Sequence, residues 1–174
     1  MANYAYILNI RPSLTTDTFL AVAKAAIPAV LGPHWKIEWA TWKFDGPTLH
    51  VTLPGTSDVV AEYWGASNGD NPPEDVGFTL SLKNKRTIAF RHSTSSDFQR
   101  WAQGCVEEEL SERLGAPLHY DAGPTTYPPG RREYRRGKTF REYCLRNFGG
   151  KVEDASHAEL LARMMRGTPP GFET

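Results

Sequence analysis

The sequence is poor in cysteine and has no long hydrophobic run. Two of its 174 residues are cysteines, Cys105 and Cys144, and both lie in apolar stretches that predict helices. This setting favours buried free thiols in a reducing compartment, although a disulfide between them stays open. No apolar run reaches the about 20 residues that cross a bilayer, and the N-terminus lacks the pattern of a secretory signal. We therefore expect a cytoplasmic protein without membrane contact.

The sequence also has no net charge. Twenty basic residues balance twenty acidic ones, so no overall field attracts nucleic acid or a membrane surface. Any electrostatic function must come from local segregation of charge. The hydrophobic content of 40% is enough for a core, and the length fits one domain with a tail.

Motifs for nucleotide, metal and cofactor binding are missing. Neither glycine-rich phosphate loop occurs, and no histidine stands in a metal-binding spacing. The loop Gly65–Asp75 carries many oxygen ligands, but their spacing departs from a calcium loop and Pro72-Pro73 interrupts it, which favours a solvated loop. We predict no cofactor, no metal and no catalytic residue from motifs. An active site assembled from distant groups stays open, with His50, Arg91, His92 and Tyr120 as candidates.

The stretch Trp35–Leu53 predicts a β-hairpin that organises the fold. Its first half alternates apolar and polar residues from Trp35 to Trp39, and Asp45-Gly46-Pro47 is typical of a turn. Trp42 and Phe44 fall on the other parity, and a bulge near Thr41 would return them to the core. All three tryptophans are therefore expected to pack inside.

Periodicity predicts the rest of residues 1–116 as an α+β core domain. A strand begins at Tyr4, a helix begins at Thr15 or Thr16 and ends or kinks near Pro28, and a second hairpin lies between Phe78 and Phe90. A second helix follows Ser95 and Ser96 and ends at Leu114. We expect a mostly antiparallel sheet of about five strands in two hairpins, with two main helices packed on it.

Residues 117–174 predict a C-terminal extension packed on this core. Pro117–Gly130 is rich in proline and glycine and resembles an extended connection. Two capping boxes, Thr139 with Glu142 and Ser156 with Glu159, predict two short helices after it.

Charge segregation is the most distinctive chemical feature. The stretch Gly104–Gly130 carries a net charge of −4, and Arg131–Lys151 carries +6. The two segments could pair with each other, or either could meet a partner. The second hypothesis predicts a partner-binding surface that comprises Glu107, Glu108, Glu109, Glu112, Arg131, Arg132, Arg135 and Arg136.

A small charge-segregated domain without a catalytic set is typical of protein-binding inhibitors and immunity proteins, so another protein is the expected partner. The alternative is an enzyme, or a protein that acts on RNA or DNA, with a cleft between the sheet and the basic segment Arg131–Arg146. Arginines interleaved with Tyr127 and Tyr134 could grip phosphates there.

Overall fold

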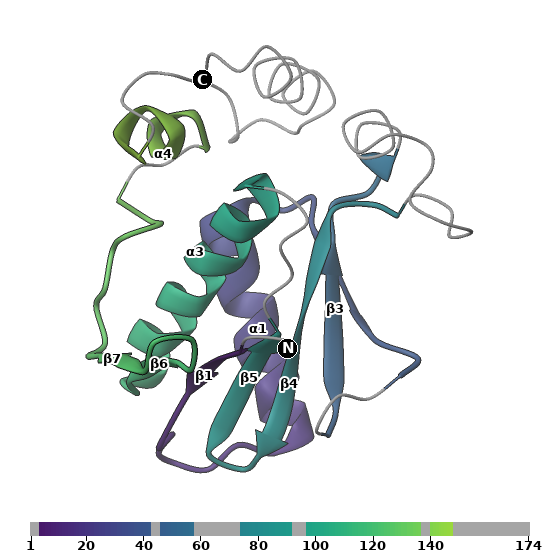
Figure 1. Ribbon diagram of the computed structural model, residues 1–174. Helices are drawn as coiled ribbons and strands as arrows, with labels where there is room; N and C mark the ends of the chain where they lie inside the picture. The colour runs from purple at the N-terminus through teal and green to yellow at the C-terminus, as the bar shows by residue number, and fades with distance from the viewer. Residues whose placement is uncertain (1–3, 43–45, 58–73, 92–96, 137–139, 148–174) are drawn as a thin grey trace.

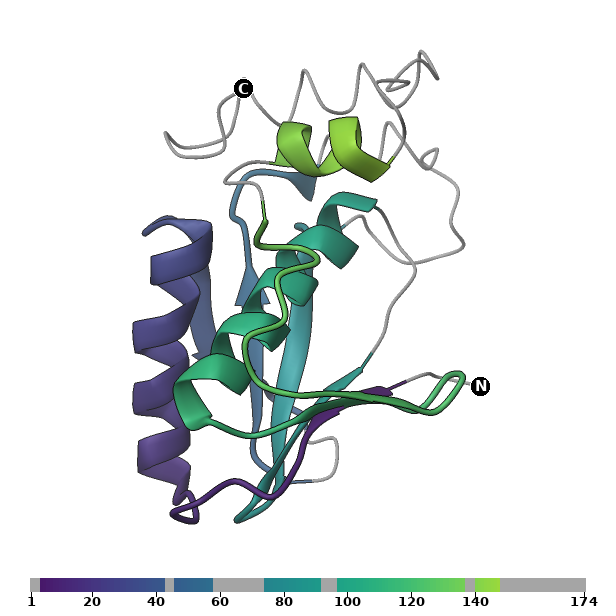
Figure 2. The same ribbon diagram turned by 90° about the vertical axis from the view of Figure 1, so that its left-hand side faces the viewer.

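A computed structural model describes residues 4–42, 46–57, 74–91, 97–136 and 140–147 of the chain. Its elements in chain order are β1 (Tyr4–Ile7), α1 (Thr16–Leu31), β2 (Lys36–Trp39), β3 (Thr48–Thr52), β4 (Gly77–Asn84), β5 (Thr87–Arg91), α3 (Asp97–Leu114), β6 (Leu118–Tyr120), β7 (Thr125–Tyr127) and α4 (Phe140–Asn147). The strands form one antiparallel sheet in the order β2-β3-β4-β5-β1-β6-β7. Both long helices lie on the same face of the sheet (Figures 1 and 2). The predicted α+β class and the two main helices are confirmed.

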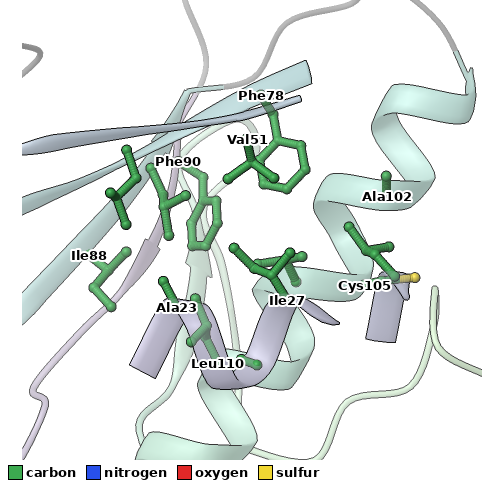
Figure 3. Packing of buried hydrophobic residues seen from close by; sticks show 14 of the residues in the cluster. Ala23, Ile27, Val51, Phe78, Ile88, Phe90, Ala102, Cys105 and Leu110 are labelled. Atoms are coloured by element: carbon green, nitrogen blue, oxygen red, sulfur yellow. The ribbon is translucent and has the colours of Figure 1, made fainter. Parts of the chain in front are cut away.

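The core lies between the two long helices and the sheet face that they cover. Alternate residues of the strands point into it, and the register places Phe78 opposite Val51 and Phe90 opposite Leu80. Figure 3 shows Val51, Phe78 and Phe90 on the side of the sheet that faces Ile27 of α1 and Leu110 of α3. Burial of this apolar surface is the main force that stabilises the fold.

Helix α1 begins with the predicted threonine cap and continues past the expected proline stop. The Thr15 hydroxyl accepts a hydrogen bond from the Thr18 backbone N–H at 3.1 Å. The helix continues through Pro28 to Leu31, so of the two predicted alternatives, an end near Ile27 is wrong and a last turn that contains the proline remains. Ile27 and Leu31 are both buried in the core, and their packing carries the helix beyond the proline.

The predicted Trp35–Leu53 hairpin is present as β2 and β3, but two of its tryptophans do not enter the core. Trp35 is buried, whereas Trp39 and Trp42 are 42% and 44% exposed. The core prediction is wrong for these two because β2 is the outermost strand and has a neighbour on one side. Gly46 of the predicted turn is required there, since its φ is +110° and a Cβ would lie 2.4 Å from the Leu82 carbonyl oxygen.

The stretch expected as an extended connection forms two more strands, β6 and β7. Strand β6 pairs with β1, so the first strand of the chain lies inside the sheet. Each of the two strands has three residues, too few for a visible alternation, and turn-forming residues surround them. The sheet thus has seven strands where about five were predicted.

Helix α4 matches the first of the two predicted short C-terminal helices. Its Phe140 is buried against α3, with ring centroids 5.2 Å from Phe98 and 5.8 Å from Trp101. The second predicted helix, after Ser156, lies outside the described residues, and so does Phe44.

Candidate functional site: a charged layer on helix α3

Helix α3 buries the first two acids of its acidic run. The side chains of Glu107 and Glu108 are fully buried, that of Glu109 is 17% exposed and that of Glu112 is 41% exposed. The irregular segment 131–136 lies along the helix and covers them. We call the contact between α3 and this segment the charged layer.

The Glu108 carboxylate binds the backbone of the covering segment. It accepts hydrogen bonds from three consecutive N–H groups, those of Glu133 at 2.8 Å, Tyr134 at 3.0 Å and Arg135 at 3.0 Å. Burial raises the pKa of Glu108, while the three N–H donors and the charge of Arg131 oppose that rise. A segment without helix or strand therefore has its backbone donors satisfied by one buried side chain.

The Glu107 carboxylate is held by side chains of its own helix and of β6. Arg100 donates to both oxygens, at 3.1 and 3.2 Å, and Gln103 donates at 2.8 Å. The Tyr120 hydroxyl donates at 2.8 Å from the sheet. Burial and the neighbouring Glu107 raise the pKa of the Tyr120 phenol above its ordinary value. Burial by itself would lower the pKa of Arg100, but Glu107 keeps it raised, so the guanidinium stays charged.

Arg135 links the covering segment to the outer acids. Its side chain is 6% exposed and donates to Glu112 at 2.6 Å, to Glu109 at 3.1 Å and to the Arg131 carbonyl oxygen at 2.8 Å. The hydrogen bond and charge of Arg135 lower the pKa of the Glu112 carboxyl. Arg135 thus acts as an internal clamp.

Tyrosine rings complete the layer by stacking with its arginines. The Arg131 guanidinium lies 4.0 Å from the ring centroid of Tyr127, and that of Arg100 lies 4.8 Å from the centroid of Tyr134. Gly104 makes room for Tyr134 on the helix surface, because a Cβ at this position would lie 2.4 Å from the ring.

The structure brings seven of the eight predicted binding residues into this layer. Arg131 lies 3.9 Å from Glu108, and the exposed Arg132 reaches Glu112 at 3.3 Å. Arg136 lies at the end of the segment and is exposed. The acidic and basic segments therefore pair with each other at six of these residues, whereas Glu107 pairs with Arg100 of its own helix.

Sequence reasoning missed two inner members of the layer, Arg100 and Gln103, and considered Tyr134 only as a residue that could help to grip phosphates. Arg100 and Gln103 precede Glu107 by seven and four residues, a spacing that places all three on one side of a helix. That spacing was a signal available in the sequence. Nothing local marks Tyr134, whose place depends on the fit to Gly104.

Of the distant groups considered for a composite active site, His50 and Tyr120 do not converge. Strands β4, β5 and β1 separate His50 on β3 from Tyr120 on β6. Tyr120 points to the helix face, whereas His50 pairs with Thr79 on the opposite face, and His92 lies outside the described residues. The basic segment lies along α3, where Glu133 and Arg135 donate hydrogen bonds to Glu108 and Glu109.

The acidic loop has a structural role where the structure describes it. The Asp75 carboxylate accepts the backbone N–H groups of Thr56 at 3.0 Å and Ser57 at 2.8 Å. Its other oxygen-bearing residues, Asn68, Asp70 and Asn71, lie outside the described residues. In the part of the chain that the structure describes, no three metal-ligating side chains gather at one point.

Comparison with known proteins does not place the chain in a family. No protein-family model matches the sequence, and neither the curated proteins nor the solved structures give a match. Within the described ranges, no helix has the length and apolarity to span a membrane.

Proposed function

We propose that the protein is a non-enzymatic protein-binding domain of the inhibitor or immunity type. The observation that supports this is the division of the charged layer into an inner and an outer set. Glu108 and Arg135 are turned inward and fix the segment 131–136, while Arg132 and Arg136 are turned outward from it. The outer set is the proposed contact surface.

The ion pairs that hold the irregular segment 131–136 favour a role in recognition over a role in stability alone. Buried ion pairs add little net stability, because desolvation of the charges offsets their attraction. What the buried ion pairs provide is a fixed geometry of the segment. A surface that is already ordered loses less conformational entropy when it binds a partner. Arginine is also enriched where proteins contact one another.

The inner groups are arranged to hold structure. Glu107 and Glu108 each accept at least three hydrogen bonds from the protein itself. A carboxylate occupied in this way is poorly placed to take a proton from a substrate. This arrangement favours binding over catalysis at the charged layer.

The test is affinity capture from the cells that make the protein, followed by titration with the purified partner. We expect Arg132→Glu combined with Arg136→Glu to weaken binding by at least about tenfold, as is usual for the loss of interface arginines. The matched control is Lys24→Glu combined with Lys85→Glu, which makes the same charge change at exposed positions on α1 and on the β4–β5 turn. Equal binding by both double variants would contradict the proposal. Capture of RNA or DNA in place of a protein would contradict it as well.

A further inference from the structure

The backbone of strand β2 has an outer side available for pairing. Ala40 donates its N–H to the Thr48 carbonyl oxygen at 2.9 Å, and the register places Glu38 opposite His50. Bonded pairs alternate along an antiparallel ladder, so Lys36, Glu38 and Ala40 bond to β3. Ile37 and Trp39 therefore direct their N–H and C=O groups away from β3. Within the described ranges, no backbone group pairs with this outer side.

The same edge carries the large apolar side chains that the described residues expose, Trp39 and Trp42. Trp39 lies on the sheet face that the helices cover, with its ring centroid 6.3 Å from that of Phe19. Trp42 lies on the opposite face, with its ring centroid 5.5 Å from that of His50. One tryptophan thus flanks the edge on each side of the sheet. Exposed aromatic residues beside an unpaired edge are typical of a protein contact.

The charges of β2 favour a second copy of the same strand. Lys36 and Glu38 lie on the sheet face opposite the helices, on either side of Ile37. We propose that two copies of this chain join their sheets by antiparallel pairing of β2 about a two-fold axis at Ile37. In that register, Lys36 of each copy lies directly opposite Glu38 of the other, in the closely spaced kind of pair that is not hydrogen-bonded. The interface is isologous, as in most symmetric dimers.

This register also fits the backbone. Ile37 bonds to Ile37 of the second copy through its N–H and C=O groups, which point away from β3. A register centred on Glu38 would place two like charges in direct opposition, which is unfavourable. The Lys36–Glu38 bridge within one chain, 2.8 Å long and exposed, costs little to exchange for bridges between chains. The inference does not depend on the charged layer.

Sedimentation velocity of the full chain over a wide concentration range tests the dimer. Wild type is expected to dimerise in a concentration-dependent way. Lys36→Glu and Glu38→Lys each create two like-charge pairs, and each should raise the dimer dissociation constant about tenfold. An equimolar mixture of the two variants restores opposite charges at both pairs, so it should form a heterodimer about as tight as wild type.

The mixture distinguishes this interface from general association or misfolding. Lys85→Glu makes the same charge change outside β2 and should leave the dimer unchanged. A wild type that stays monomeric would overturn the proposal. So would a Lys36→Glu variant that dimerises like wild type, or a mixture that associates no better than its components.

Discussion

Gly104 on α3 and Tyr134 in the covering segment fit together so closely that a single methyl group would separate them. A Cβ on Gly104 would lie 2.4 Å from two atoms of the Tyr134 ring. The contact joins the helix to a segment thirty residues later in the chain. Glycine is required at position 104 because any side chain there would overlap the Tyr134 ring.

The first prediction concerns this contact. In a helix interior, Gly→Ala ordinarily stabilises by about 1 kcal/mol. Here we expect Gly104→Ala to lower the free energy of unfolding by about 1–3 kcal/mol, because the ring must move. Denaturant unfolding measures the change. In a Tyr134→Ala background, the same substitution should regain its stabilising sign, and persistence of the loss there would show that Tyr134 is not the cause.

A second prediction concerns the Glu108 carboxylate. Glu108→Gln replaces one acceptor oxygen with an N–H₂ group that faces backbone donors, so we expect a loss of about 2 kcal/mol or more in unfolding free energy. The matched control is Glu112→Gln on the exposed end of the same helix, where the loss should stay below about 1 kcal/mol. Hydrogen exchange of the N–H groups of residues 133–135 should accelerate in the first variant. Equal losses of unfolding free energy in the two variants would contradict a special contribution of the buried Glu108 carboxylate to stability.

The two neighbouring arginines at the end of the segment give a third test. Arg135 is nearly buried and holds Glu109 and Glu112, whereas Arg136 is exposed. We expect Arg135→Met to lower the unfolding free energy by about 2 kcal/mol, and Arg136→Met to change it by less than about 0.5 kcal/mol. Thermal unfolding of both variants in one buffer compares them directly. Similar unfolding free energies for the Arg135→Met and Arg136→Met variants would contradict the proposed role of Arg135 in holding the segment to α3.

A fourth prediction concerns alkaline pH. Burial raises the pKa of the Tyr120 and Tyr134 phenols above the ordinary value of 10.0, so the folded protein holds these protons after the unfolded chain has lost them. The resulting stability is complete below pH 10 and is lost as the pH rises further, because ionisation then favours the unfolded state.

Absorbance of tyrosinate during a pH titration measures this behaviour. The chain has seven tyrosines, and we expect two of them to ionise only together with unfolding. Tyr120→Phe should remove one of the two late ionisations. Early ionisation of all seven in the folded protein would contradict the burial of these phenols.

The sequence predicted those parts of the fold that depend on local pattern. Leu49, Val51, Phe78 and Phe90 alternate within their strands, and they lie in the core as expected. Thr15 caps α1 because its hydroxyl accepts the backbone N–H of Thr18, which lies three residues further along the chain. Such features need no knowledge of distant residues.

Other features depend on which strand becomes an edge and on long-range fit. Trp39 was expected inside because it shares its parity with Trp35 and Ile37, but alternation cannot show that β2 has a neighbour on one side only. The acids and arginines of the charged layer were identified by type. Their division into inner and outer residues depends on the path of the segment 131–136 across α3, and residue type does not determine that path.

The central place of β1 governs the order in which the chain can assemble. Tyr4 pairs with Arg91, and Ala5 pairs with Tyr120, so β1 is synthesised long before either of its neighbours. Once β5 has been made, β1 is available to pair with it, but the other side of β1 stays without its partner until residues 118–120 of β6 have been made. Closing such long loops slows folding. We therefore expect the sheet to close late, after synthesis of most of the chain, with the hairpins as its first ordered parts.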